Sequence, residues 1–163
     1  MSQFRILLGM ALLSTAASAY AALGSAPTYP VTASSTSAGA ATQTALVARF
    51  AASNAAAPSY TVSQTTLPSG LVVNEYITTG NTVFALSWEG PAMPQLKTLL
   101  GTYFPSYVAG VNAAHAAQGG GYGPAVVNQS ALVVETGGHM GAFVGRAYLP
   151  QALPQGLNAD DIK

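Results

Sequence analysis

An apolar stripe with the period of an α-helix constrains the fold of this chain most strongly. Pro94 suits the first turn of such a helix. Pro105 lacks a backbone N–H and clashes with the carbonyl of Gly101, but the stripe keeps its phase, so one kinked helix is expected. The spacing predicts that the stripe is buried against a core. Its eight members are Leu96, Leu99, Leu100, Tyr103, Phe104, Tyr107, Val108 and Val111.

Three short segments before this helix have the composition of strands. Tyr60–Leu67, Leu71–Thr78 and Val83–Glu89 are rich in β-branched and aromatic residues. Pro68-Ser69-Gly70 and Thr79-Gly80-Asn81 separate them and are turn sequences. Because the connections are short, the three strands are expected to form an antiparallel meander.

Two further strands are predicted after the helix. Ala131–Thr136 and Ala142–Tyr148 are joined through a glycine-containing turn and should form a hairpin. In the third meander strand, Phe84, Leu86 and Trp88 share one face by the two-residue period, and we expect that face to meet the core.

These elements predict an α+β fold for residues 59–163. Its sheet would be antiparallel and five-stranded, built from the meander and the C-terminal hairpin, with the long kinked helix packed on one face. Pro150 and Pro154 should end regular structure, and residues 158–163 are expected to be a polar tail.

Residues 1–21 have the pattern of a secretory signal peptide. Arg5 precedes a short apolar core, Ile6–Leu13, and Ala19-Tyr20-Ala21 supplies the small residues of a cleavage site. Cleavage is expected after Ala19 or Ala21, and the mature protein is expected in the periplasm or outside the cell.

Residues 22–58 form a segment rich in alanine, serine and threonine. Such a composition buries too little apolar area to offset its ordering entropy, so a flexible arm is expected. Ala41–Ala52 is alanine-rich, with Leu46 and Phe50 four residues apart, and predicts a marginal helix that needs a docking surface. The arm is either a partner-binding segment or a spacer.

The overall composition argues against several functions. Only 6% of the residues are charged, which is too few to build a basic surface for nucleic acid. The chain has no cysteine, which excludes disulfides, thiolate catalysis, cysteine-ligated metal and a lipid-modified cysteine after the signal. No integral membrane segment is expected after signal cleavage.

Several phrases in the chain together resemble one known family. The phrases are Leu67-Pro68-Ser69-Gly70, Val83-Phe84-Ala85-Leu86-Ser87-Trp88-Glu89-Gly90-Pro91, Leu99-Leu100-Gly101-Thr102-Tyr103-Phe104, Val133-Val134-Glu135-Thr136-Gly137-Gly138, Gly145-Arg146-Ala147-Tyr148-Leu149-Pro150 and Ala22-Leu23-Gly24. The resemblance is to an exported proteobacterial family, domain of unknown function 2844, and it implies export and a compact small domain but no activity, cofactor or catalytic residue.

The histidines are the first candidates for chemistry. His139 lies in the glycine-flanked turn of the predicted hairpin, four residues after Glu135, and could act as a general base. A solvated turn residue is the simpler interpretation. His115 is placed near the end of the predicted helix and is expected to be exposed there. Two lone histidines provide no metal-ligand spacing, so no metal site is assigned.

Charged and aromatic residues give three more hypotheses. Glu75 and Glu89 could form a carboxylate pair of the glycosidase kind, or both could face solvent. Glu135 and Arg146 are expected to form a cross-strand ion pair with a structural role. Trp88 is either a binding hot spot or, more simply, a packed residue whose N–H is satisfied.

The leading functional hypothesis is a non-enzymatic exported domain. It would bind a protein or another envelope component through a sheet edge or through the arm. One alternative is a small periplasmic hydrolase using His139 and Glu135. The other is a carrier of a small apolar ligand in a cavity between helix and sheet, lined by Tyr103, Tyr107 and Trp88. We assign no catalytic, cofactor-binding or metal-binding residue.

Overall fold

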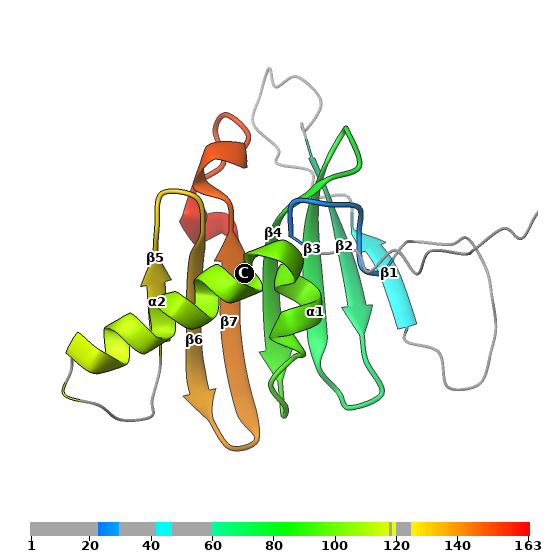
Figure 1. Ribbon diagram of the computed structural model, residues 1–163. Coiled ribbons are helices and arrows are strands. Elements are labelled where there is room, and N and C mark those ends of the chain that lie inside the picture. The colour runs from blue at the N-terminus through cyan, green and yellow to red at the C-terminus, as the bar shows by residue number, and fades with distance from the viewer. Residues whose placement is uncertain (1–22, 30–41, 47–59, 118, 120–124) are drawn as a thin grey trace, which may run out of the picture.

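A computed structural model describes residues 23–29, 42–46, 60–117, 119 and 125–163, and shows helices crossing one face of a single sheet (Figure 1). The strands are β1 (Thr42–Leu46), β2 (Tyr60–Thr66), β3 (Val72–Thr78), β4 (Val83–Gly90), β5 (Ala125–Asn128), β6 (Val133–His139) and β7 (Ala142–Tyr148). The helices are α1 (Leu96–Leu100), α2 (Phe104–Ala117) and the 3-10 turns η1 (Gly101–Tyr103), η2 (Pro150–Ala152) and η3 (Ala159–Asp161).

The described strands form one antiparallel sheet in the order β1-β2-β3-β4-β7-β6-β5. The α+β class, the meander and the C-terminal hairpin are therefore confirmed, and the two units join where β4 pairs with β7. The predicted count of five strands is wrong. The region from Tyr60 onward contributes six, because the four-residue β5 pairs with β6, and β1 adds a further strand at the other edge. A strand as short as β5 carries little periodic signal.

The predicted helix at Ala41–Ala52 is also wrong where the chain is described. Thr42–Leu46 is a strand that pairs with β2 from Thr42 opposite Thr66 to Leu46 opposite Val62. The edge of β2 offers unpaired backbone groups, and these outweigh the weak helical preference of a dozen alanine-rich residues.

The N-terminal segment, residues 23–29, belongs to the fold and not to a flexible arm. Leu23 is 1% exposed, and its N–H donates to the carbonyl of Leu99 at 2.8 Å. The next two residues bond the start of β4: Gly24 donates to the carbonyl of Val83, and Val83 donates to that of Ser25, both at 2.8 Å. The signal peptide predicted for residues 1–21, and most of the arm, lie outside the described residues.

The helical segment breaks where a single kinked helix was expected. α1 ends at Leu100, and Gly101 takes a φ of +51°, a conformation that costs glycine little. Pro105 lies in the first turn of α2, and its ring disfavours a continuous helix by crowding the carbonyl of Gly101. The result is two helices joined by a 3-10 turn, pointing in different directions (Figure 1).

The apolar stripe packs on the sheet except at one residue. Leu96, Leu99 and Leu100 are buried, and Tyr103, Phe104, Tyr107 and Val111 pack partly buried against the same core. Val108 is 38% exposed, contrary to the prediction. Phe104, Tyr107 and Val111 of the same helix keep their contact with the core, so Val108 lies at the exposed edge of the stripe.

A bulge in β4 divides its side chains between the two faces of the sheet. Ile77 pairs with Val83 and Tyr76 with Ala85, so Phe84 is an extra residue on its strand. Leu86 and Trp88 face the helices as predicted. Phe84 does not, because the extra residue reverses the alternation, and it packs in a second core on the opposite face.

The residues after Pro150, which we call the tail, cover part of that opposite face. Leu157 and Ile162 are buried against Tyr60, Tyr76 and Phe84, so the polar tail expected at residues 158–163 is in fact packed. η3 carries a capping box, in which the Asp161 carboxylate accepts the N–H of Asn158 at 2.9 Å. The N-terminal segment and the tail therefore cover opposite faces of one sheet.

Candidate functional site

The ion pair between Glu135 and Arg146 organises the tail side of the sheet. These residues are direct cross-strand partners on β6 and β7, and Nε of Arg146 donates to the Glu135 carboxylate at 2.7 Å, as predicted. Nη1 of Arg146 donates to the carbonyl of Ala159 at 2.6 Å. The hydrogen bond to Glu135 raises the pKa of Arg146 against an opposing effect of burial. The pair has a structural role, because it fixes the tail to the sheet.

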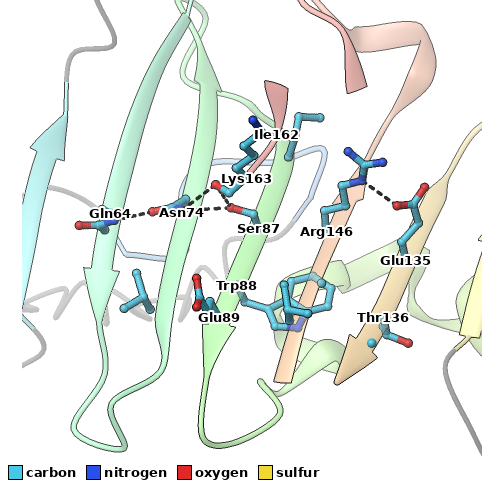
Figure 2. Close-up of a pocket in the computed structure, with 14 residues that line it drawn as sticks. Gln64, Asn74, Ser87, Trp88, Glu89, Glu135, Thr136, Arg146, Ile162 and Lys163 are labelled. Atoms are coloured by element: carbon cyan, nitrogen blue, oxygen red, sulfur yellow. Dashed lines mark hydrogen bonds and ion pairs between the residues drawn. The ribbon is translucent and has the colours of Figure 1, made fainter. Parts of the chain in front are cut away.

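A row of polar side chains extends from this pair across β4, β3 and β2. Ser87 lies opposite Arg146, then come Asn74 and Gln64. Gln64 donates to Asn74 at 3.0 Å, and Asn74 donates to Ser87 at 3.1 Å. Asn74 and Ser87 also donate to the main-chain oxygen of Lys163 at 3.0 and 2.6 Å (Figure 2).

Beyond this row the sheet face opens into a hollow of about 640 Å³, which we call the open-face groove. Its next row consists of the cross-strand neighbours Val72, Glu89 and Val144. Val144 is 52% exposed, Glu89 is exposed, and Val72 is partly buried. Ile162 and Lys163 of the tail line the groove, so the groove continues the surface on which the tail lies.

The charges of the groove are unevenly matched. Glu135 is paired with Arg146, whereas the Glu89 carboxylate has no hydrogen bond or ion pair within the described residues. Along β4, Ser87 lies beside the tail and Glu89 lies farther from it (Figure 2). The Lys163 side chain also lines the groove, and its ammonium group points away from Glu89 (Figure 2). The arrangement offers an apolar floor with one unpaired carboxylate, which suits binding by contact.

Glu75 and Glu89 do not form a carboxylate pair. They lie on opposite faces of the sheet, and Glu75 is 0% exposed. Its carboxylate accepts the backbone N–H of Thr28 at 2.7 Å and of Tyr29 at 3.2 Å. Burial raises the pKa of Glu75, although these two hydrogen bonds oppose the shift. Glu75 holds the N-terminal segment on the sheet. Glu89 faces solvent, as the alternative to a carboxylate pair predicted for it.

His139 and Glu135 are not brought together. They are four positions apart on β6, which is roughly 13 Å along an extended strand. His139 is exposed at the end of the β6–β7 hairpin, where Nδ1 lies 3.0 Å from the carbonyl oxygen of Met140. Glu135 faces Arg146 instead. The geometry lends no support to the hydrolase alternative.

His115 and Trp88 each differ from the expectation. His115 is more buried than expected, and the indole N–H of Trp88 lacks the expected hydrogen bond. His115 lies in the last turn of α2 as predicted but is half-buried, and its Nε2 has no partner in the described segments. Trp88 packs in the core next to Gly145, where an added Cβ would collide with the indole ring. Its Nε1 likewise lacks a partner among the residues described, contrary to the expectation that it is satisfied.

The tyrosines predicted to line a ligand cavity pack against the helix-side core. Tyr103 and Tyr107 are partly buried there, and Tyr107 forms a side-chain hydrogen bond with Thr136. The open-face groove lies on the other face of the sheet, and its lining includes Trp88 but neither tyrosine. The geometry therefore gives the carrier alternative no support at the predicted place.

Metal-ligand clusters and membrane-spanning helices are both absent from the part of the chain that the structure describes. Those residues contain no group of three or more His, Cys, Asp and Glu side chains placed to hold a metal ion. No helix in the described ranges has the length and apolar character needed to cross a membrane.

Fold and groove together define a small α+β protein with one antiparallel sheet and an open groove on one face of it. The chain belongs to the family described as "Protein of unknown function (DUF2844)", whose model matches residues 19–162. The family resemblance inferred from short phrases of the sequence is thereby confirmed. No curated protein and no solved structure matches the chain.

Proposed function

We propose that this protein is an exported, non-enzymatic domain that binds a segment of another envelope protein in the open-face groove. The observation that carries the proposal is the groove itself, a hollow of about 640 Å³ whose floor includes the exposed apolar surface of Val144. Concave surfaces with apolar floors and few polar groups are typical of binding sites.

The polar side chains around the groove support binding over catalysis. Arg146, Asn74 and Ser87 are engaged with the tail, and Glu135 is engaged with Arg146. Each of these groups has a structural partner, and a change at any of them would disturb the tail. What the groove presents to an incoming molecule is largely apolar surface, the Glu89 carboxylate and, at the tail end, the Lys163 side chain.

The face of the sheet is a better contact surface than the edges proposed from the sequence. On one edge, β1 of the arm already pairs with β2. The other edge is β5, four residues long and in contact with α2. The two edge strands, β1 and β5, have five and four residues and so offer only short rows of backbone groups, whereas the groove spans several strands.

Export is the part of the proposal that rests on residues 1–21. Leu23 is buried two residues after Ala21, so cleavage after Ala19 or Ala21 leaves every residue of the N-terminal segment in place. Intact mass measurement of protein from the periplasm or medium should show a chain beginning at Tyr20 or Ala22. A full-length chain retained in the cytoplasm would contradict export.

Site-specific photo-crosslinking tests the binding proposal. A photoreactive amino acid is placed at Val144 in the groove and, as a matched control, at Met140, which is exposed in the nearby hairpin turn outside the groove. In envelope extract, position 144 is expected to give a discrete protein adduct and position 140 is not. Equal adducts at both positions, or none at 144, would contradict the proposal.

A further inference from the structure

We propose that the occupant of the open-face groove is an extended peptide segment carrying a lysine or arginine between small apolar side chains. This inference rests on the proposed function and specifies its partner. Three observations carry it: the arrangement of Val72, Glu89 and Val144, the unmatched charge of Glu89, and the way the tail lies on the same face.

The apolar-acidic-apolar row gives the groove its pattern. Val72, Glu89 and Val144 are successive cross-strand neighbours, so their Cβ atoms lie on one face at intervals of about 5 Å. The carboxylate is flanked on each side by a branched apolar side chain. A complementary ligand carries a cation flanked by apolar groups on the same scale as a peptide.

The unpaired carboxylate of Glu89 determines which charge the ligand should carry. The lining holds two acidic side chains, Glu89 and Glu135, and two basic ones, Arg146 and Lys163. Arg146 neutralises Glu135 at 2.7 Å, and the Lys163 ammonium group points away from Glu89 (Figure 2). Glu89 has no such partner in the described part of the chain, so it attracts a positive group. Placing an acidic side chain in the same position would set two like charges side by side at a cost in binding.

The tail shows that this face accepts extended backbone. The main-chain oxygen of Lys163 accepts hydrogen bonds from Asn74, Tyr76 and Ser87 at 3.0, 3.0 and 2.6 Å, and its N–H donates to the Tyr76 hydroxyl at 2.9 Å. Ile162 is buried beside it. The groove begins at Ile162 and Lys163, so an incoming peptide would continue the surface already used by the tail.

Selection from a random dodecapeptide library tests the inference, because such a library samples ligands of every charge and polarity. The library is displayed on phage and selected against the full mature chain. We expect the enriched sequences to share a lysine or arginine flanked by valine, alanine or similar residues. Enrichment of acidic or wholly apolar sequences would overturn the inference, and the latter would favour a general apolar surface.

Variants of the groove give the quantitative test. The best enriched peptide is synthesised and its dissociation constant measured by calorimetry with the wild type, Glu89→Gln and Asp160→Asn. Glu89→Gln should weaken binding about two- to fivefold, the range of an exposed ion pair, and the effect should shrink in high salt. Asp160 lies outside the groove, and its side chain is 93% exposed with Oδ1 3.5 Å from Nη2 of Arg146. Asp160→Asn removes the same charge and, because so exposed a contact contributes little, should change binding little. Equal effects of the two variants would overturn the inference.

One more variant separates failure of this inference from failure of the proposed function. Val144→Gln makes the apolar floor of the groove polar without changing its charge, and its fold is checked by thermal unfolding. Binding lost in Val144→Gln but unchanged in Glu89→Gln would support the groove and overturn the basic peptide. Binding unaffected by Val144→Gln, or no enriched peptide at all, would overturn both.

Discussion

Glu75 is the residue whose burial has the clearest energetic consequence. Its side chain projects from β3 and is fully buried beneath the N-terminal segment, where two backbone N–H groups donate to its carboxylate. The cross-strand neighbour Ser63 is buried beside it, and its hydroxyl has no hydrogen-bond partner in the described ranges. Burial and then the negative charge of Glu75 raise the pKa of Tyr29.

Because the pKa of Glu75 is raised above its ordinary value of 4.5, folding should depend on pH with a definite sign. Between 4.5 and the native pKa, the folded state binds more protons than the unfolded state, so stability falls as pH rises through this window. Glu75→Gln removes the titration. Urea unfolding from the ordinary carboxyl pKa up to neutral pH should show the wild type losing stability relative to the variant as pH rises, whereas parallel profiles would contradict the buried carboxylate.

Single residues differ in how far the sequence could place them. The contact of Glu135 with Arg146 was predictable because both lie in one short hairpin, where the turn sets the register. The separation of Glu75 from Glu89 was not, because it depends on the faces of two strands and on an N-terminal segment that looked too polar to dock. The sequence could not assign Glu89 to the groove, because its neighbours there, Val72 and Val144, lie on two other strands.

At the scale of elements, α2 and β5 approach each other through Gly110. A Cβ at this position would lie 2.5 Å from Cγ1 of Val127, closer than a side chain tolerates. Glycine thus permits the close packing of a helix that has no fully buried residue of its own.

Gly110→Ala should therefore destabilise the protein. Overpacking costs about 1–3 kcal/mol, and the better helical propensity of alanine recovers roughly 1 kcal/mol. In a Val127→Ala background the space is restored, so the same change should become neutral or stabilising. Urea unfolding of the four proteins in a double-mutant cycle measures this coupling. An equal cost in both backgrounds would show that α2 does not approach β5 as described.

Local signals predicted most elements, and the errors occurred where distant segments meet. Short turns and two-residue periodicity were enough for the meander and the hairpin. The break at Gly101 was indicated only by a proline four residues later, and the stripe alone could not show that Val108 lies at its exposed edge. The alanine-rich composition around β1 predicted a helix, but this segment forms a strand because it pairs with the edge of β2.

At the scale of the whole molecule, the two ends of the described chain cover opposite faces of the sheet. Leu23 enters the core under the helices, and Ile162 enters the core on the other face. Ile162 and Lys163 of the tail line the open-face groove together with residues of β2, β3, β4, β6 and β7. No local pattern predicts the groove, because these lining residues come from separate parts of the chain.

Ile162→Ala should destabilise the protein by about 2–4 kcal/mol, because it removes a fully buried aliphatic side chain and leaves a cavity. Val126→Ala, on the exposed side of β5, serves as the control and should change stability by less than about 0.5 kcal/mol. Thermal and urea unfolding compare the two. A small effect of Ile162→Ala would mean that the tail is not packed on the sheet.

The central claim is that the sheet face beside the tail is a binding surface, and amide chemical shifts test it most directly. ¹H–¹⁵N spectra of the mature chain are recorded while the peptide selected on it is added. We expect saturable shifts centred on Val72, Glu89 and Val144, with little change at His115 or Met140. Shifts centred on the helices or on β5, with the groove residues unchanged, would contradict it.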